Sequence, residues 1–301
     1  LNVIQMFSIW GLILLFTLNL KENFKNKKSI LAFIFITLFF VLTFLKVDFS
    51  PSNLEINAFD VGNSDCFLIK TKNKDYILID SGKKPYKGLT SAETVINRYL
   101  ENEKIRKIKI LVLTHFDSDH AGGVIDILKA NKVEKVYLQK EDGKNLLSKE
   151  ILDYLKTNKI NYEIAKNNET IYFDSKSGLE IKTYTPKINK PSKNKDNEES
   201  ILTLLKYKNK NFLFMGDCGI EGFRTVQKFL PNKVDFIKIG HHGAKNVLDN
   251  SMVKALNFDY ALISAGDDQF NHPHYSTVEI LEENKIKTAS TKDFGFIKII
   301  L

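Results

Sequence analysis

The chain has 301 residues and a formal net charge of +8, which is enough sequence for one large α/β domain or two small ones with a buried core. Only three of its 44 basic residues are arginine, and five lysines and one glutamate place a net charge of +4 in the first 47 residues. The charge is therefore weak support for a nucleic-acid surface. Cys66 and Cys218 lack zinc-ribbon spacing and are expected to be buried hydrophobic residues, while a disulfide stays open if the domain is extracellular.

Two apolar stretches, 1–20 and 29–45, open the chain. At about 1.5 Å per residue the first is long enough to cross a bilayer comfortably and the second narrowly. The eight residues between them include four lysines, and short basic loops stay in the cytoplasm. We therefore expect a transmembrane hairpin at 1–47, a linker at 48–53 and an extracytoplasmic domain at 54–301. No basic residue precedes the first run, which argues against a signal peptide, and the initial Leu indicates an alternative start codon or the tail of a longer membrane protein.

The domain after the linker is predicted to contain short strands followed by a mixture of helices and strands. Strands are expected at 54–59, 66–71, 75–80, 109–114, 135–138, 179–184, 201–207, 212–215, 235–239, 259–264 and 294–301. Helices are expected at 92–101, from 122, at 149–158, at 220–229, between 240 and 258, and at 276–283. The polar, charge-dense stretch 186–199 is predicted to be a mobile surface loop. A mixture without a strict βαβ repeat favours an α/β fold with two sheets and helices outside them.

The six histidines lie in three short groups, and each group follows a hydrophobic strand. The groups are His115 with His120, His241 with His242, and His272 with His274. Asp80 and Asp217 also end apolar strands, although Asp80 alone is as well explained by a turn. Strand ends in a layered α/β domain converge on one edge, and imidazole with carboxylate suits divalent zinc or manganese. The sequence therefore predicts a metal site.

The segment THFDSDHAGG at 114–123 joins four of these polar residues to a pair of glycines. Gly122 and Gly123 let the backbone turn into a helix and keep side chains out of the site. The segment resembles the metal-binding motif of the metallo-β-lactamase superfamily, usually His-x-His-x-Asp-His. Asp in place of the second His, together with FDVGNSDCFLI, HHG and HPH, is similar to the extracellular hydrolase domain of the ComEC family of competence DNA-uptake proteins. The resemblance runs from about residue 54 to the end of the chain and implies an αββα sandwich preceded by membrane helices.

The resemblance implies two divalent metal ions, zinc or manganese. The first would be held by His115 and Asp117, the second by Asp119, His120 and His241, with Asp217 bridging them. Asp80 matches a position that orients the site, and Asp65 matches a nearby carboxylate.

The superfamily usually supplies another His between 120 and 241, and none is present. Asn197 and Ser200 resemble the pair that ComEC-like sequences have there. This leaves the first position ligand-poor: empty, weakly occupied or completed by water. One histidine of the HHG pair is enough as a ligand, so His242 is interpreted as a structural hydrogen-bonding residue behind the site or beside the substrate. Of His272 and His274, one is expected to touch the substrate or leaving group, with a satisfied loop histidine as the alternative.

Two such ions, about 3.5–4 Å apart, would generate hydroxide for an in-line attack on phosphorus. Asp119 and Asp217 would hold the hydroxide, and His272 or His274 would protonate or stabilise the leaving oxygen. The resemblance implies a membrane-anchored nuclease that degrades one strand of incoming DNA, with a separate channel-forming subunit as a candidate partner and an open oligomeric state. The alternatives are a phosphodiesterase on wall polymers or phosphocholine groups, and a non-catalytic DNA-guiding cap. Cleavage of β-lactams is disfavoured because two of the usual histidines are missing.

Overall fold

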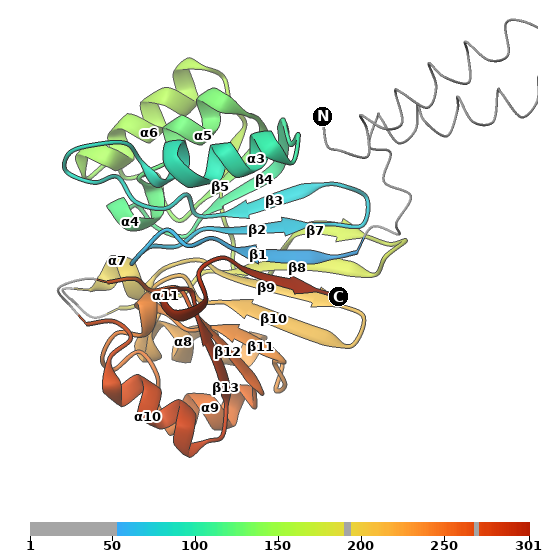
Figure 1. The fold of residues 1–301 in the computed structure, drawn as a ribbon, viewed down its shortest axis with the longest axis vertical. Coiled ribbons are helices and arrows are strands. Elements are labelled where there is room, and N and C mark those ends of the chain that lie inside the picture. The colour runs from blue at the N-terminus through green and yellow to red at the C-terminus, as the bar shows by residue number, and fades with distance from the viewer. Residues whose placement is uncertain (1–52, 190–193, 268–270) are drawn as a thin grey trace, which may run out of the picture. The chain divides into compact units, whose positions relative to one another are not determined.

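Two seven-stranded β-sheets pack face to face in the computed structural model, which describes residues 53–189, 194–267 and 271–301 (Figure 1). The predicted transmembrane hairpin, and all of the linker except its last residue, lie outside these ranges. Within these ranges no helix combines the length and apolarity needed to cross a membrane. The predicted α/β architecture of two sheets with helices outside is confirmed.

The first sheet carries the N-terminal half of the domain together with the last strand of the chain. Its order is β14 (Ile297–Ile300), β1 (Glu55–Ala58), β2 (Phe67–Lys70), β3 (Tyr76–Ile79), β4 (Lys107–Leu113), β5 (Lys132–Leu138) and β6 (Tyr162–Ile164). Strands β14 to β3 pair antiparallel, and β3 to β6 pair parallel. Its outer face is covered by η1 (Ala92–Ile96), α3 (Asn97–Asn102), α5 (Val124–Ala130) and α6 (Leu146–Thr157).

The second sheet repeats this pattern of antiparallel and parallel pairing. Its order is β13 (Lys287–Ser290), β12 (Tyr260–Ile263), β11 (Phe236–Lys238), β10 (Lys210–Phe214), β9 (Leu202–Tyr207), β8 (Leu179–Tyr184) and β7 (Glu169–Asp174). Strands β7 to β10 pair antiparallel, and β10 to β13 pair parallel. Its outer face packs against α8 (Ile220–Val226), η2 (Gln227–Phe229), α9 (Asn250–Leu256) and α10 (Tyr275–Glu283).

Side chains alternate between two apolar layers along the central strands. On β2, Leu68 faces the helices, whereas Phe67 and Ile69 face the second sheet. Phe67 meets Phe214 of β10 with ring centroids 5.3 Å apart. A strand buried on both faces reads as an unbroken apolar run, which is why these strands are visible in the sequence.

The differences from the predicted elements fall on short or half-exposed segments. Strands β6, β7 and β13 were not predicted, and three of the six residues of β7 are partly or fully exposed. The final strand begins at Ile297 because the one-turn helix α11 (Thr291–Phe294) precedes it. The stretch predicted to be a loop contains another one-turn helix, α7 (Lys195–Glu198), so that prediction is wrong for its second half.

Both cysteines are buried and free, so the disulfide that the sequence left open is not formed. Burial raises the pKa of each thiol well above its usual value. Cys66 and Cys218 therefore behave as the small hydrophobic residues that were expected.

Gly122 is required by close backbone packing under the turn that leads into α5. A Cβ added at this residue would lie 2.1 Å from Lys84 N and 2.3 Å from Ser118 O. We expect Gly122→Ala to lower the free energy of unfolding by about 3 kcal/mol, because neither backbone atom can move without disturbing its segment. Denaturant unfolding measures this change. Gly178→Ala, which meets open space at φ +70°, is the control and should cost about 1 kcal/mol; equal losses would contradict the steric explanation.

Candidate metal centre

The predicted metal-binding residues gather at the edge where the parallel strands of both sheets end (Figure 1). The one-turn helix α4 (Ser118–Ala121) follows β4 and carries Asp119 and His120. A helix this short is unstable alone, so hydrogen bonds from neighbouring loops must hold it. The carbonyl of His120 accepts from both the backbone N–H and the hydroxyl of Ser81, each at 2.8 Å, and the carbonyl of Asp119 accepts from the Ser64 hydroxyl.

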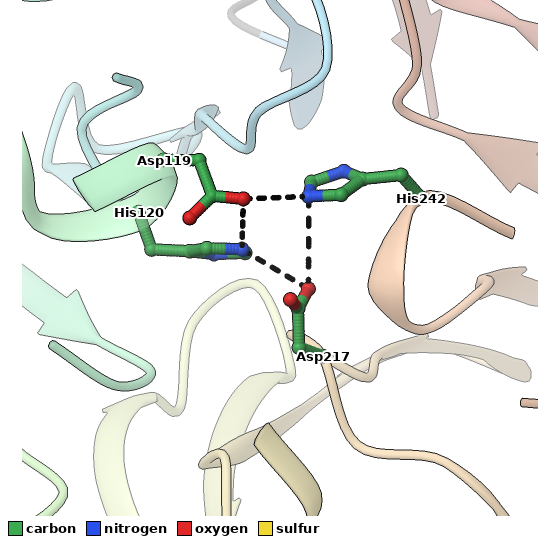
Figure 2. Close-up of side chains that lie close together, drawn as sticks. All are labelled: Asp119, His120, Asp217 and His242. Atoms are coloured by element: carbon green, nitrogen blue, oxygen red, sulfur yellow. Dashed lines mark hydrogen bonds and ion pairs between the residues drawn. The ribbon is translucent and has the colours of Figure 1, made fainter. Parts of the chain in front are cut away.

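Four side chains point toward a common space at this edge (Figure 2). Asp119 Oδ2 lies 3.2 Å from His242 Nε2 and 3.9 Å from His120 Nε2. Asp217 Oδ1 lies 3.0 Å from His120 Nε2 and 3.9 Å from His242 Nε2. The four ligand atoms all lie within 4.8 Å of one another, which is compact enough for one metal ion to contact them all.

The other carboxylate oxygen of Asp217 faces a second group of side chains. Asp217 Oδ2 lies 3.8 Å from His115 Nε2 and 3.8 Å from His241 Nε2. His115 Nε2 is in turn 3.6 Å from Asp117 Oδ2. The two oxygens of one carboxylate thus face two different groups, which is the geometry that a bridging ligand needs.

The neighbouring histidines of the HHG segment occupy different groups from those expected. The sequence reasoning put His241 beside Asp119 and His120, but the structure places His242 there and His241 on the His115 side. The cause is the backbone of η3 (His241–Gly243), where His241 has φ 46° and His242 has φ 53°. Two successive left-handed residues aim adjacent imidazoles to either side of Asp217.

Asn197 and Ser200 lie beside this second group, near the position where the superfamily motif usually has another histidine. Asn197 Nδ2 is 3.5 Å from His241 Nε2, and Ser200 Oγ is 3.3 Å from His115 Nδ1. The Ser200 hydroxyl also accepts from the backbone N–H of Asp217. These contacts join α7 and the start of β9 to the candidate centre.

The tautomers of two histidines are set by hydrogen bonds behind the cluster. His120 Nδ1–H donates to Asp80 Oδ2 at 2.8 Å, and His242 Nδ1–H donates to the Ser264 carbonyl at 2.9 Å. Asp80 is itself held by the backbone N–H and hydroxyl of Thr114, both at 2.8 Å. With each Nδ1 committed, Nε2 is the ring nitrogen that faces the cluster, as a metal-ligating histidine requires.

Three buried atoms of the cluster complete no hydrogen bond among the described residues: His115 Nε2, and the facing pair His120 Nε2 and Asp217 Oδ1, which are 3.0 Å apart. A buried polar atom without a partner is costly, and a divalent ion would satisfy all three. Imidazole nitrogens and carboxylate oxygens suit zinc or manganese. The side chains therefore fit the metal ions that the sequence predicts.

Opposite charges reinforce one another across the cluster. Burial disfavours the imidazolium form of His120, but the carboxylates of Asp217 and Asp80 outweigh burial and raise its pKa well above the usual value. Burial likewise opposes ionisation of Asp217, yet His120 and His242 hold its pKa well below the usual range. Burial lowers the pKa of His241, which is further from the carboxylates. The imidazoles and carboxylates of the cluster thus stabilise one another's charged forms.

The two histidines around Pro273 are separated by the structure. The His272 ring stands over the cluster, with its centroid 6.0 Å from that of His241 and 6.2 Å from that of His242, and its Nδ1 is 3.2 Å from Asn63 Oδ1. His274 instead accepts from the backbone N–H of Ser276 as the N-cap of α10. Of the two, His272 is therefore the one beside the metal-binding side chains.

Sequence reasoning missed Lys238, at the end of β11, and Asn63. The Lys238 side chain is buried against Asp65, which lies directly behind the cluster. The one signal that pointed to Lys238 is a lysine inside the otherwise apolar run FIKIG. Asn63 gave no signal beyond that of an ordinary turn residue.

Asp80→Asn is expected to weaken metal binding about 10- to 100-fold, because the amide cannot accept from both Thr114 and His120 as the carboxylate does. The fold should persist, since asparagine tolerates the φ of +59° at this residue. Metal titration by calorimetry measures the change. Asp60→Asn is the exposed control from the neighbouring loop. Wild-type affinity in Asp80→Asn would show that Asp80 serves only the turn.

Comparison with known families agrees with this fold and site. Residues 59–186 match the family described as the metallo-beta-lactamase superfamily. Among solved structures, the chain is similar to Igni18, a metallo hydrolase from Ignicoccus hospitalis, at 15% identity and TM-score 0.54, over 81% of this chain and 98% of that one. It is also similar to CmlA, a diiron beta-hydroxylase from Streptomyces venezuelae, at 14% identity and TM-score 0.56, over 83% of this chain and 55% of that one. The fold, the family match and the His/Asp cluster together support a metal-dependent hydrolase.

Among curated proteins, the chain is similar to the competence family that the motifs indicated. It is 24% identical to ComE operon protein 3 of Bacillus subtilis, over 81% of this chain and 32% of that protein. It is 29% identical to Recombination protein 2 of Haemophilus influenzae, over 94% of this chain and 34% of that protein. The chain thus spans about a third of the length of these relatives. The predicted resemblance to the superfamily and to ComEC-like proteins is confirmed.

Proposed function

We propose that this protein is a membrane-anchored, metal-dependent phosphodiesterase that cleaves DNA during competence-related uptake. The observation that carries the proposal is Asp217, whose two carboxylate oxygens face two groups of imidazoles and carboxylates. The similarity to ComE operon protein 3 supports DNA as the substrate. Two metal ions, zinc or manganese, would supply a hydroxide at neutral pH and neutralise charge on the phosphate.

The residues of the two groups would divide the work of binding. Asp119, His120 and His242 would hold one ion, and His115, Asp117 and His241 the other, with Asp217 shared between them. The second group has fewer fixed contacts because Asn197 and Ser200 stand where the superfamily has a histidine. We therefore expect this position to bind its ion more weakly.

His272 would act on the leaving oxygen. Its ring stands beside His241 and His242, and its Nδ1 is near Asn63 Oδ1. With Nδ1–H donating to this amide oxygen, Nε2 is the ring nitrogen that would serve the reaction. A protonated His272 could then donate to the departing oxygen while Asp119 and Asp217 orient the attacking one.

The test uses the full chain in detergent with end-labelled single-stranded and double-stranded DNA. We expect cleavage in the presence of manganese or zinc and none in EDTA. Soluble phosphocholine esters and wall-polymer fragments are assayed in parallel, because they are the alternative substrates. Cleavage of those esters without cleavage of DNA would replace the proposed substrate. No hydrolysis with any divalent ion would favour a non-catalytic DNA-guiding cap on a separate channel-forming subunit.

The proposal places the hydrolase domain outside the cytoplasm, because the loop between the two apolar stretches is short and basic. Protease added to intact spheroplasts is therefore expected to digest the domain. A cytoplasmic marker protein is the control for leakage. Full protection of the domain, with a lysed sample digested normally, would contradict the topology.

A further inference from the structure

Lys238 is a buried lysine that contacts Asp65 and the Gly216 carbonyl, and both lie next to candidate metal ligands. It is 2% exposed, its Nζ pairs with the Asp65 carboxylate and it donates to the Gly216 carbonyl at 2.8 Å. Its neighbours in the sequence, Ile237 in β11 and Ile239 just after it, are both buried apolar residues. We propose that Lys238 is a positioning residue that fixes the metal position formed by Asp119, His120, Asp217 and His242.

Burying the Lys238 ammonium has a cost in free energy. Removing an ammonium and a carboxylate from water costs several kcal/mol per ion, and their attraction often does no more than offset that cost. An apolar residue at 238 would continue the core of β11 and serve stability at least as well. Stability alone therefore gives no reason for a lysine here, so its contacts must supply the reason.

Asp65 lies behind two of the proposed ligand histidines, on the side of their Nδ1 atoms. Asp65 Oδ1 is 3.5 Å from His242 Nδ1, and Asp65 Oδ2 is 3.8 Å from His120 Nδ1. Both Nδ1–H groups already donate elsewhere, to Ser264 and Asp80. Without Lys238, the Asp65 carboxylate would be a free acceptor able to draw either ring out of its orientation.

Asp65 also forms a competing group with Asp80 and His120, whose ligand atoms all lie within 4.8 Å of one another. The Lys238 ammonium pairs with the Asp65 carboxylate, and the Nδ1–H of His120 donates to the Asp80 carboxylate. The pairing therefore excludes a cation from the wrong side of His120. A metal ion is then left with the Nε2 side of His120, where Asp119, Asp217 and His242 stand.

Lys238 also holds the Gly216 carbonyl, in the turn that precedes Asp217. Gly216 has φ +54° and directly precedes Asp217, so the orientation of its peptide sets where the Asp217 carboxylate points. Its carbonyl accepts from Lys238 and from the backbone N–H of His241, at 2.8 Å and 3.2 Å. One ammonium thus ties Asp65, the turn before Asp217 and the start of the histidine pair together.

The inference rests on the proposed metal centre, and its test separates positioning from stability. The full chain is prepared as Lys238→Met, Asp65→Asn and the double variant Lys238→Met/Asp65→Asn. The double variant removes both charges and keeps the approximate volume. The control is Lys210→Met/Asp235→Asn, a more exposed ion pair of 2.7 Å between the first residue of β10 and the residue before β11, at the opposite end of β11 from Lys238. For each protein we measure thermal unfolding in EDTA and manganese affinity by calorimetry.

We expect each single variant to unfold at a lower temperature and the double variant to recover most of that loss. Its manganese affinity should nevertheless stay at least ~10-fold below that of the wild type, because methionine cannot donate to the Gly216 carbonyl that sets the direction of Asp217. The control pair should bind manganese as the wild type does. Wild-type affinity in the double variant would overturn the inference and assign Lys238 to stability alone.

Failure of the proposed function gives a different result. Manganese bound by the wild type without DNA cleavage would refute the nuclease while the affinity comparison still decides the role of Lys238. A wild-type protein that binds neither manganese nor zinc would overturn both.

Discussion

Asp217→Asn is expected to leave the protein folded and to slow metal-dependent DNA cleavage at least ~100-fold, the scale at which one main electrostatic element of an active site is felt. Asp217 is 2% exposed, and its two oxygens face imidazoles of both groups. The amide is nearly isosteric but carries no charge and offers one acceptor oxygen instead of two. Metal affinity and the position of the attacking hydroxide should therefore be lost together. Initial rates on labelled DNA at saturating manganese measure the effect.

Asp235→Asn is the control for this variant. Asp235 is also buried, but it lies just before β11, at the opposite end of that strand from the metal-binding residues. It should keep wild-type activity at a temperature below its unfolding transition. Cooperative thermal unfolding of Asp217→Asn would show that the fold persists. Wild-type nuclease rates in a folded Asp217→Asn protein would reject the two-metal mechanism.

His242→Ala is expected to remove about one metal ion per chain and nearly all activity, because His242 Nε2 faces both Asp119 and Asp217. Asp119→Ala and His120→Ala should behave in the same way. His241→Ala should spare this ion and affect only the more weakly held one. Metal content after dialysis, measured by mass spectrometry, tests the order.

The adjacent histidines make each variant the natural control for the other. They share backbone, sequence neighbours and chemistry, and they differ in which oxygen of Asp217 they face. Greater metal loss in His241→Ala than in His242→Ala would contradict the assignment drawn from the structure and favour the one drawn from the sequence.

The parts of the fold that the sequence predicted are those whose local pattern and burial agree. Strand β4 was predicted because an apolar strand in the centre of a sandwich must be hydrophobic on both faces, as Leu111 and Val112 show by facing different layers. Strand β7 was not predicted because it is a half-buried edge strand with an irregular register between Thr170 and Tyr172, so its apolar residues do not alternate with polar ones. Helix α7 escaped because its order comes from distant residues: the Glu198 carboxylate accepts from the backbone N–H groups of Gly219 and Gly222.

The same distinction applies to the site. The cluster on α4 was predicted because its spacing is local, and Asp217 because it ends an apolar strand. The exchange of His241 and His242 depends on two left-handed backbone conformations that no residue type announces. Lys238 was missed because its partner Asp65 is 173 positions away in the chain.

The peptide unit that joins His241 to His242 has a consequence for how the centre would fill with metal. It is a single rigid plane with an imidazole on either side of Asp217, so the two proposed ion positions share one piece of backbone. When one ion orders this peptide plane, the plane is ordered for the second ion as well. Binding of the second ion then costs less conformational entropy of the protein. Metal loading would then be cooperative, with an ion in either position raising the affinity of the other position.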